Sequence, residues 1–118
     1  MNKIVFRILL TIYAIAILAV SSIPGGALPH IDILSFDKIL HIIEYSILAF
    51  LAVNAIKTPS TRMILLIIVV GSFYGGLNEI WQTLVADRFA SIYDAIANVI
   101  GMVIGSIISV KFLLLTHD

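Results

Sequence analysis

Residues 91–105 read SIYDAIANVIGMVIG, and their pattern of polar and small residues predicts how the chain packs. It opens a long apolar run, Ile92–Leu115, which is interrupted by polar and small residues at helical spacing. These residues are Asp94, Asn98, Gly101 and Gly105. At roughly 100° per residue their positions fall on one stripe of an α-helix. The pattern predicts a membrane helix that packs closely against a neighbouring helix along this stripe.

The rest of the chain has the same apolar character. Of 118 residues, 61% are hydrophobic and 12% are charged, and the mean hydropathy is +1.15. A soluble domain is typically about half apolar and a quarter charged. The composition therefore excludes a water-soluble single domain and a disordered chain. Seven basic and seven acidic residues cancel, so no bulk charge would attract nucleic acid, and the absence of cysteine excludes disulfides and thiolate metal sites.

Four apolar segments have the length of membrane spans: Ile4–Val20, Leu40–Ile56, Met63–Leu84 and Ile92–Leu115. Each has about 17–24 residues, enough to cross a hydrocarbon core of ~30 Å. Short connections make successive helices antiparallel neighbours. We therefore expect an all-α integral membrane protein, a compact bundle of four transmembrane helices that forms a single domain over residues 1–118. A cleaved signal peptide is the alternative interpretation of the first segment, which has a basic start.

The placement of basic residues predicts the orientation of the bundle. Five of them lie at the N-terminus, in the second connection and near the C-terminus: Lys3, Arg7, Lys57, Arg62 and Lys111. The opposite side carries two, Lys38 and Arg88. Because positive residues are enriched in cytoplasmic loops, we expect a multi-pass protein of the cell membrane with both termini in the cytoplasm.

Polar residues gather in the halves of the helices that would lie in the outer leaflet. Charges inside membrane spans are costly and usually face the bundle interior or a wet cavity. The second segment carries Asp37, His41 and Glu44 on one arc, with Lys38 and Tyr45 at its edge. The inner halves look almost purely apolar, which argues against a transport path. The stripes predict a polar pocket that opens toward the outer leaflet.

Glycines lie on the same stripes, deeper in the membrane. Gly71 and Gly75 share a stripe with Asn78 and Gln82, next to Glu79, and Gly101 and Gly105 share one with Asp94 and Asn98. Because small residues let helix backbones approach closely, these glycines would close the pocket from beneath.

The pocket would bind its ligand through eight polar residues: Asp37, Lys38, Glu44, Tyr45, Gln82, Arg88, Ser91 and Asn98. Lys38 and Arg88 would meet an anionic or polar head group. If the protein is an enzyme, His41, Glu79 and Asp94 are the candidates for acid–base catalysis. A structural interpretation exists as well, because Ser91 and Asp94 fit a helix capping box. One histidine with three carboxylates is a weak zinc set, so we expect no metal and no cofactor.

The order and spacing of these residues carry a family resemblance. The first half is D-K-x-x-H-x-x-E-Y over residues 37–45. The second half is E-x-x-Q from Glu79, followed by R-x-x-S-x-x-D-x-x-x-N-x-x-G-x-x-x-G over residues 88–105. The combined pattern resembles that of the VanZ-like family. The chain departs from it at residues 86–87, where Ala-Asp replaces the Pro-Gly that family members often have before the arginine.

The resemblance implies a cell-envelope context and the location of the site. The family is named for a protein associated with resistance to a glycopeptide, teicoplanin. We expect the chain to bind an amphiphilic envelope molecule in an outward-facing polar pocket: a membrane lipid, a lipid-linked precursor or a lipoglycopeptide. A membrane-embedded enzyme that uses the same pocket for acid–base chemistry on a lipid head group is the alternative. Two further alternatives are a small transporter and a subunit that assembles with a membrane-protein partner.

Overall fold

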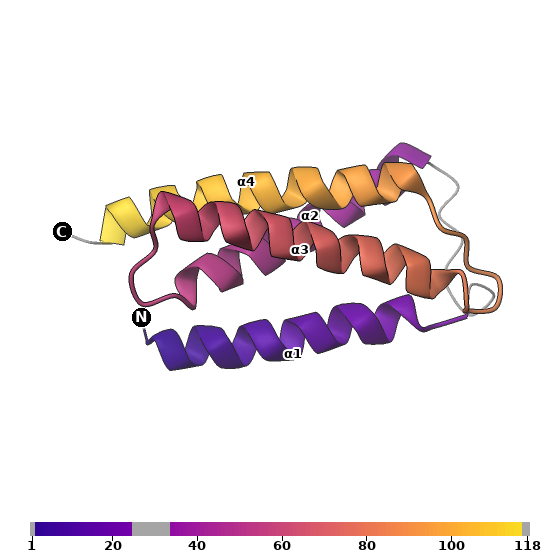
Figure 1. The fold of residues 1–118 in the computed structure, drawn as a ribbon, viewed down its shortest axis with the longest axis horizontal. Helices are drawn as coiled ribbons and strands as arrows, with labels where there is room; N and C mark the ends of the chain where they lie inside the picture. Colours follow the sequence, from indigo (N-terminus) through magenta and orange to yellow (C-terminus); the bar gives the residue numbers. More distant parts are fainter. Residues whose placement is uncertain (1, 25–33, 117–118) are drawn as a thin grey trace.

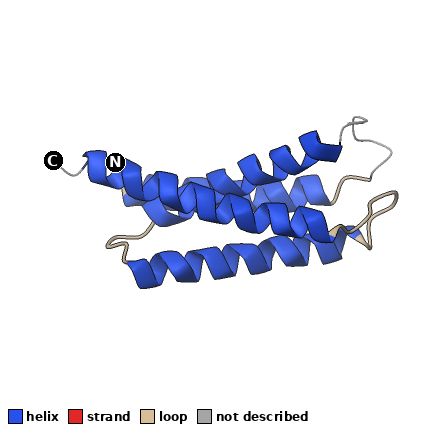
Figure 2. Ribbon diagram, turned by 90° about the horizontal axis from the view of Figure 1, so that it is seen from above, coloured by secondary structure: helices blue, strands red, loops and turns tan. Residues whose placement is uncertain are grey.

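The computed structural model describes residues 2–24 and 34–116, and every regular element in these residues is a helix (Figures 1 and 2). The helices are α1 (Lys3–Ser21), α2 (Leu34–Asn54), α3 (Thr61–Gln82) and α4 (Ile92–Thr116). The predicted all-α bundle of four helices is confirmed. The expected turn-rich stretch around Pro29 lies outside the described residues.

Three of these helices, α1, α3 and α4, are long and apolar enough to cross a membrane. Helix α2 has 21 residues, or about 31 Å, but its first turns carry several charges. It begins at Leu34, six positions before the apolar run predicted from Leu40. The reason is electrostatic, because Asp37 lies in its first turn, where the helix dipole stabilises a carboxylate.

Helices α2 and α4 share the most extensive interface of the bundle, and α1 packs on α2 and α3 but not on α4. In Figure 1, α1 and α4 lie on opposite sides, and the N- and C-terminal ends of the chain lie at one end of the bundle. The core at the centre contains Ile17, Tyr45, Leu48, Ala49 and Met102. Two parallel helices, α2 and α4, therefore begin at the end of the bundle opposite the termini.

Glycine makes the close α2–α4 interface possible. A Cβ atom at Gly101 would lie 2.5 Å from the Ile42 carbonyl oxygen. One at Gly105 would fall on the Ser46 carbonyl and lie 2.7 Å from the Ser46 Cα atom. Both helices thus meet backbone to backbone, and the Ser46 hydroxyl donates a hydrogen bond to the Gly101 carbonyl at 3.1 Å. The predicted role of this stripe in close packing is confirmed.

The half of this interface nearer the chain termini, which was expected to be almost purely apolar, also buries polar side chains, so that expectation was wrong. Asn54 is buried and donates hydrogen bonds to the Ser109 hydroxyl at 2.6 Å and to the Phe50 carbonyl at 2.9 Å. Ser106, three positions before Ser109 on α4, is buried as well, and its hydroxyl has no hydrogen-bond partner among the described residues. A polar side chain is tolerated at this depth where the same or the facing helix supplies its partner, and average hydropathy hides such pairs.

Candidate functional site

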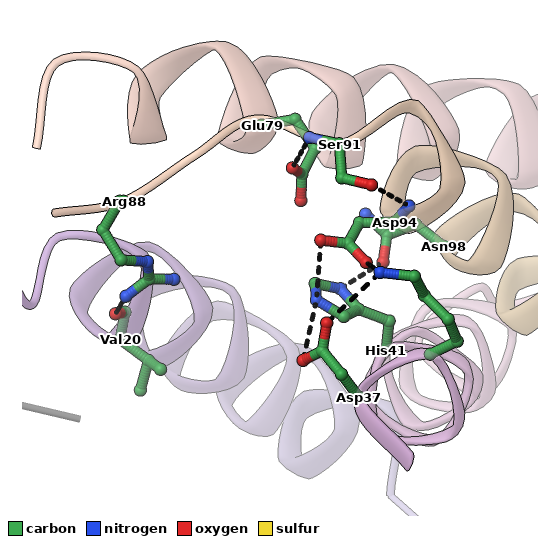
Figure 3. A network of polar contacts seen from close by, with 9 residues as sticks. Val20, Asp37, His41, Glu79, Arg88, Ser91, Asp94 and Asn98 are labelled. Atoms are coloured by element: carbon green, nitrogen blue, oxygen red, sulfur yellow. Dashed lines mark hydrogen bonds and ion pairs between the residues drawn. The ribbon is translucent and has the colours of Figure 1, made fainter. Parts of the chain in front are cut away.

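Five polar side chains meet where α2 and α4 begin: Asp37, Lys38, His41, Asp94 and Asn98, which we call the α2–α4 cluster (Figure 3). The Lys38 ammonium donates to a carboxylate oxygen of Asp94 and, at 3.3 Å, to Oδ2 of Asp37. His41 Nδ1 lies 3.0 Å from Asn98 Oδ1. Its Nε2 lies 3.7 Å from Asp94 Oδ2 and 3.9 Å from Asp37 Oδ1. The predicted stripes of α2 and α4 are therefore in direct contact.

The positions of these groups follow from the helix geometry. Asp37 and His41 are one turn apart on α2, and Asp94 and Asn98 are one turn apart on α4. The two helices run parallel, so both rows start at the same end. The close approach at Gly101, one turn further along α4, brings the rows within hydrogen-bond reach.

The exposure of the cluster's side chains decreases from the surface toward the interior of the bundle. The Asp37 side chain is 41% exposed, Lys38 26%, His41 18% and Asp94 10%. Asn98 is fully buried. Asp37 thus presents a carboxylate at the surface, while Asp94 and Asn98 form the buried side of the cluster.

Glu79 holds the start of α4 in place rather than contacting the cluster through a hydrogen bond. Its Oε2 accepts a hydrogen bond from the Ser91 backbone N–H at 3.1 Å, and the Ser91 hydroxyl accepts one from the Asp94 N–H at 3.4 Å. In a capping box, the Ser91 N–H would instead donate to the side chain of the acid at position 94. Because the buried Glu79 of α3 accepts the Ser91 N–H bond in place of Asp94, the Asp94 carboxylate is free to pair with Lys38.

Arg88 lies apart from the α2–α4 cluster (Figure 3). Its guanidinium donates to the carbonyls of Val20 at 3.2 Å and Ile23 at 2.9 Å, at the end of α1. Arg88 thus adds a donor at the end of α1, where the Val20 carbonyl also accepts a hydrogen bond from the Ile23 N–H at 3.2 Å. The neighbouring Asp87 adopts a left-handed conformation with φ 58°. Glycine, the residue that family members often have here, adopts this conformation without steric cost, whereas Asp87 adopts it as a non-glycine residue.

The remaining predicted residues lie deeper. Tyr45 is buried, and its hydroxyl accepts a hydrogen bond from Asn78 Nδ2 at 3.3 Å. Glu44 is half-buried, and its backbone carbonyl accepts from the Tyr13 hydroxyl at 2.8 Å. Gln82 is buried at the end of α3. Sequence reasoning omitted Asn78 from the site, although its place on the Gly71–Gly75–Gln82 stripe is a signal that could have found it.

Three members of the cluster could offer ligand atoms to a metal ion. Atoms of Asp37, His41 and Asp94 all lie within 4.8 Å of one another. The Lys38 ammonium bonds both carboxylates and supplies the positive charge that a cation would bring. The arrangement is thus complete as an ion-pair network, and a metal would have to displace Lys38.

Comparison with known families shows which family the chain belongs to. The family model described as VanZ/LLP1 matches residues 2–115, which is nearly the whole chain. No curated protein and no solved structure matches the chain. The match extends well beyond residues 37–105, on which the resemblance of the polar pattern depends. Together with the apolar helices, it identifies the chain as a membrane protein of the VanZ/LLP1 family.

Proposed function

We propose that this protein binds the head of an amphiphilic cell-envelope molecule at the α2–α4 cluster. The observation that carries the proposal is a partly exposed group of two carboxylates, an ammonium and an imidazole at the surface of an otherwise apolar bundle. Charged side chains within membrane helices are costly and are therefore functional candidates.

The surroundings suit a ligand with a polar head and apolar tails. Ile39 and Ile43 on α2 and Ile92 and Ile96 on α4 are exposed beside the cluster, each at 49% or more of its surface. Apolar tails would lie along these side chains while the head reached Asp37 and its neighbours. A lipid, a lipid-linked precursor and a lipoglycopeptide all have this form.

The charges of the cluster favour a particular head. Asp37 and Asp94 outnumber the single ammonium of Lys38, and both Lys38 and Arg88 already bond to groups of the chain. A bare phosphate would therefore meet mostly carboxylates. Hydroxyl or amino groups, as on a sugar or an amine-bearing head, would find acceptors at Asp37 and Asp94.

The location of the site relative to the membrane is part of the proposal. The basic residues of the opposite end support a multi-pass protein of the cell membrane with cytoplasmic termini. The α2–α4 cluster would then open at the outer leaflet, where envelope precursors are used.

Mass spectrometry of lipids that copurify with the protein tests the proposal. The parent should retain a molecule whose head carries hydroxyl or amino groups. Asp94→Asn should reduce its amount, because it removes the carboxylate that both Lys38 and His41 approach. Asp87→Asn, on the exposed third connection, is the matched control and should retain it. An identical lipid profile in all three proteins would refute binding at the cluster.

The geometry of His41 favours catalysis as a second candidate. With Asn98 Oδ1 as acceptor, Nδ1 carries a proton, and Nε2 faces the carboxylates of Asp37 and Asp94. An imidazole oriented in this way can exchange a proton with a bound head group. An enzyme carrying His41→Gln should accumulate unreacted ligand, whereas a binding protein should yield the same molecule as the parent, unaltered.

A further inference from the structure

A large apolar groove lies in the half of the bundle away from the α2–α4 cluster. Its volume is about 610 Å³, within the usual range of ligand sites, and it is formed by α1, α2 and α3. It runs from Arg7 to Ala14 along α1, seven positions or about 10 Å. Leu10 and Ala14 face Leu48 and Ala52 of α2 and Ala55 just after it, and these residues line the groove.

The groove is bounded at its deep end. The Tyr74 hydroxyl donates a hydrogen bond to the Ala14 carbonyl at 2.5 Å and ties α3 to α1 at that point. Met102 of α4 and Gly71 of α3 form its floor. Such a cavity in a bilayer fills with whatever apolar chain enters from the lipid.

Two basic side chains distinguish the other end, Arg7 and Lys57, which both line the groove and are both exposed. Arg7 Nε donates to the Ala55 carbonyl at 3.0 Å, which holds the guanidinium beside the end of α2. That bond uses one of five N–H donors of an arginine. Among the described residues that line the groove, none is acidic, so the local charge is positive.

We propose that this groove binds one acyl chain of an anionic phospholipid, with the lipid phosphate on Arg7 and Lys57. Basic pockets between transmembrane helices on the cytoplasmic side are suited to anionic head groups. A guanidinium pairs with phosphate oxygens in a bidentate manner, and an ammonium adds a point charge. The site differs from the α2–α4 cluster in both position and charge, because the cluster presents a majority of carboxylates.

Native mass spectrometry of the full chain in mild detergent tests the proposal. The probes are phosphatidylglycerol and phosphatidylcholine with identical acyl chains. The parent should retain phosphatidylglycerol several-fold better. Lys57→Gln should reduce the preference, and the pair Arg7→Gln with Lys57→Gln should bring it close to parity. Lys57 is exposed, so its single variant measures binding even if loss of the Arg7–Ala55 bond harms folding.

Three further variants test whether the preference depends on the groove itself. Arg62→Gln with Lys111→Gln removes two exposed charges that do not line the groove, and should keep the preference. Ala52→Phe fills the groove and should weaken binding of both lipids. The proposal is overturned if the control pair loses the preference as fully as the groove pair, since diffuse interfacial charge would then explain it. It is also overturned if Ala52→Phe leaves phosphatidylglycerol binding unchanged. Asp37→Asn should leave the preference unaltered, which separates this site from the α2–α4 cluster.

Discussion

A single methyl group added at Gly105 should weaken the bundle strongly. The new Cβ atom of Gly105→Ala would fall on the Ser46 carbonyl and lie 2.7 Å from the Ser46 Cα atom. Ordinary van der Waals separations begin at 3.4 Å, so the methyl group would be about 0.7 Å too close even to that second atom. A backbone carbonyl cannot rotate away as a side chain can. Helices α2 and α4 must therefore separate, and the α2–α4 cluster above would widen.

The free-energy cost of the Gly105→Ala clash can be isolated by comparing two matched variants. Gly76 also lies within a helix, α3, and a Cβ atom there would meet nothing within 4 Å. Both glycine-to-alanine changes gain about the same helix propensity, so the difference between them isolates the clash. Overpacking costs about 1–3 kcal/mol, and we expect the upper part of this range because the obstacle is backbone. Gly71→Ala should cost less than Gly105→Ala, because its new Cβ would press on the flexible Met102 side chain.

Thermal unfolding in detergent, followed by circular dichroism, provides the measurement. Gly105→Ala should melt well below the parent, and Gly76→Ala should melt at or above it. Equal melting of Gly105→Ala and Gly76→Ala would mean that the glycine stripe faces lipid. The interface between α2 and α4, and with it the geometry of the cluster, would then be wrong.

Three other predictions concern the cluster, the third connection and the topology. Lys38→Met leaves the Asp94 carboxylate without its ammonium and should destabilise the protein by about 1–3 kcal/mol in detergent unfolding, while adding Asp94→Asn should recover part of the loss. Asp87→Gly should raise the melting temperature slightly and Asp87→Val should lower it, because the backbone there is left-handed; the opposite order would contradict that conformation. In this cysteine-free chain, Ala86→Cys should react with an impermeant maleimide on intact cells and Thr58→Cys should react only after lysis; the reverse pattern would invert the topology.

Helix positions were predictable because apolar length and polar periodicity are local properties. The fourth segment was expected at Ile92–Leu115 and is found at Ile92–Thr116. The stripe of Asp94, Asn98, Gly101 and Gly105 needed only the helical repeat, and its close packing on a neighbouring helix followed from the glycines. In the third connection, Asp87 adopts a left-handed conformation, which glycine favours.

The hydrogen-bond partners of individual side chains were not predictable in the same way. Nothing local assigns the Ser91 N–H to Glu79, twelve positions earlier, rather than to Asp94. Arg88 likewise bonds carbonyls at the end of α1, more than sixty positions away, although its charge favoured a ligand role. Such choices depend on how the helices are rotated against one another, and many rotations satisfy the same sequence pattern.

Recognition of the polar head of an envelope amphiphile by the α2–α4 cluster, as we propose, can be tested at a single carboxylate. Asp37 is the more exposed of its two carboxylates, so Asp37→Asn tests recognition with little effect on packing. The most direct measurement is the amount of the copurifying molecule per protein in the parent and in Asp37→Asn, determined by quantitative mass spectrometry at equal helical content. We expect Asp37→Asn to lose, several-fold, a ligand whose head carries hydroxyl or amino groups. Equal retention by the two proteins, or a parent that carries only bulk phospholipid in bulk proportions, would contradict it.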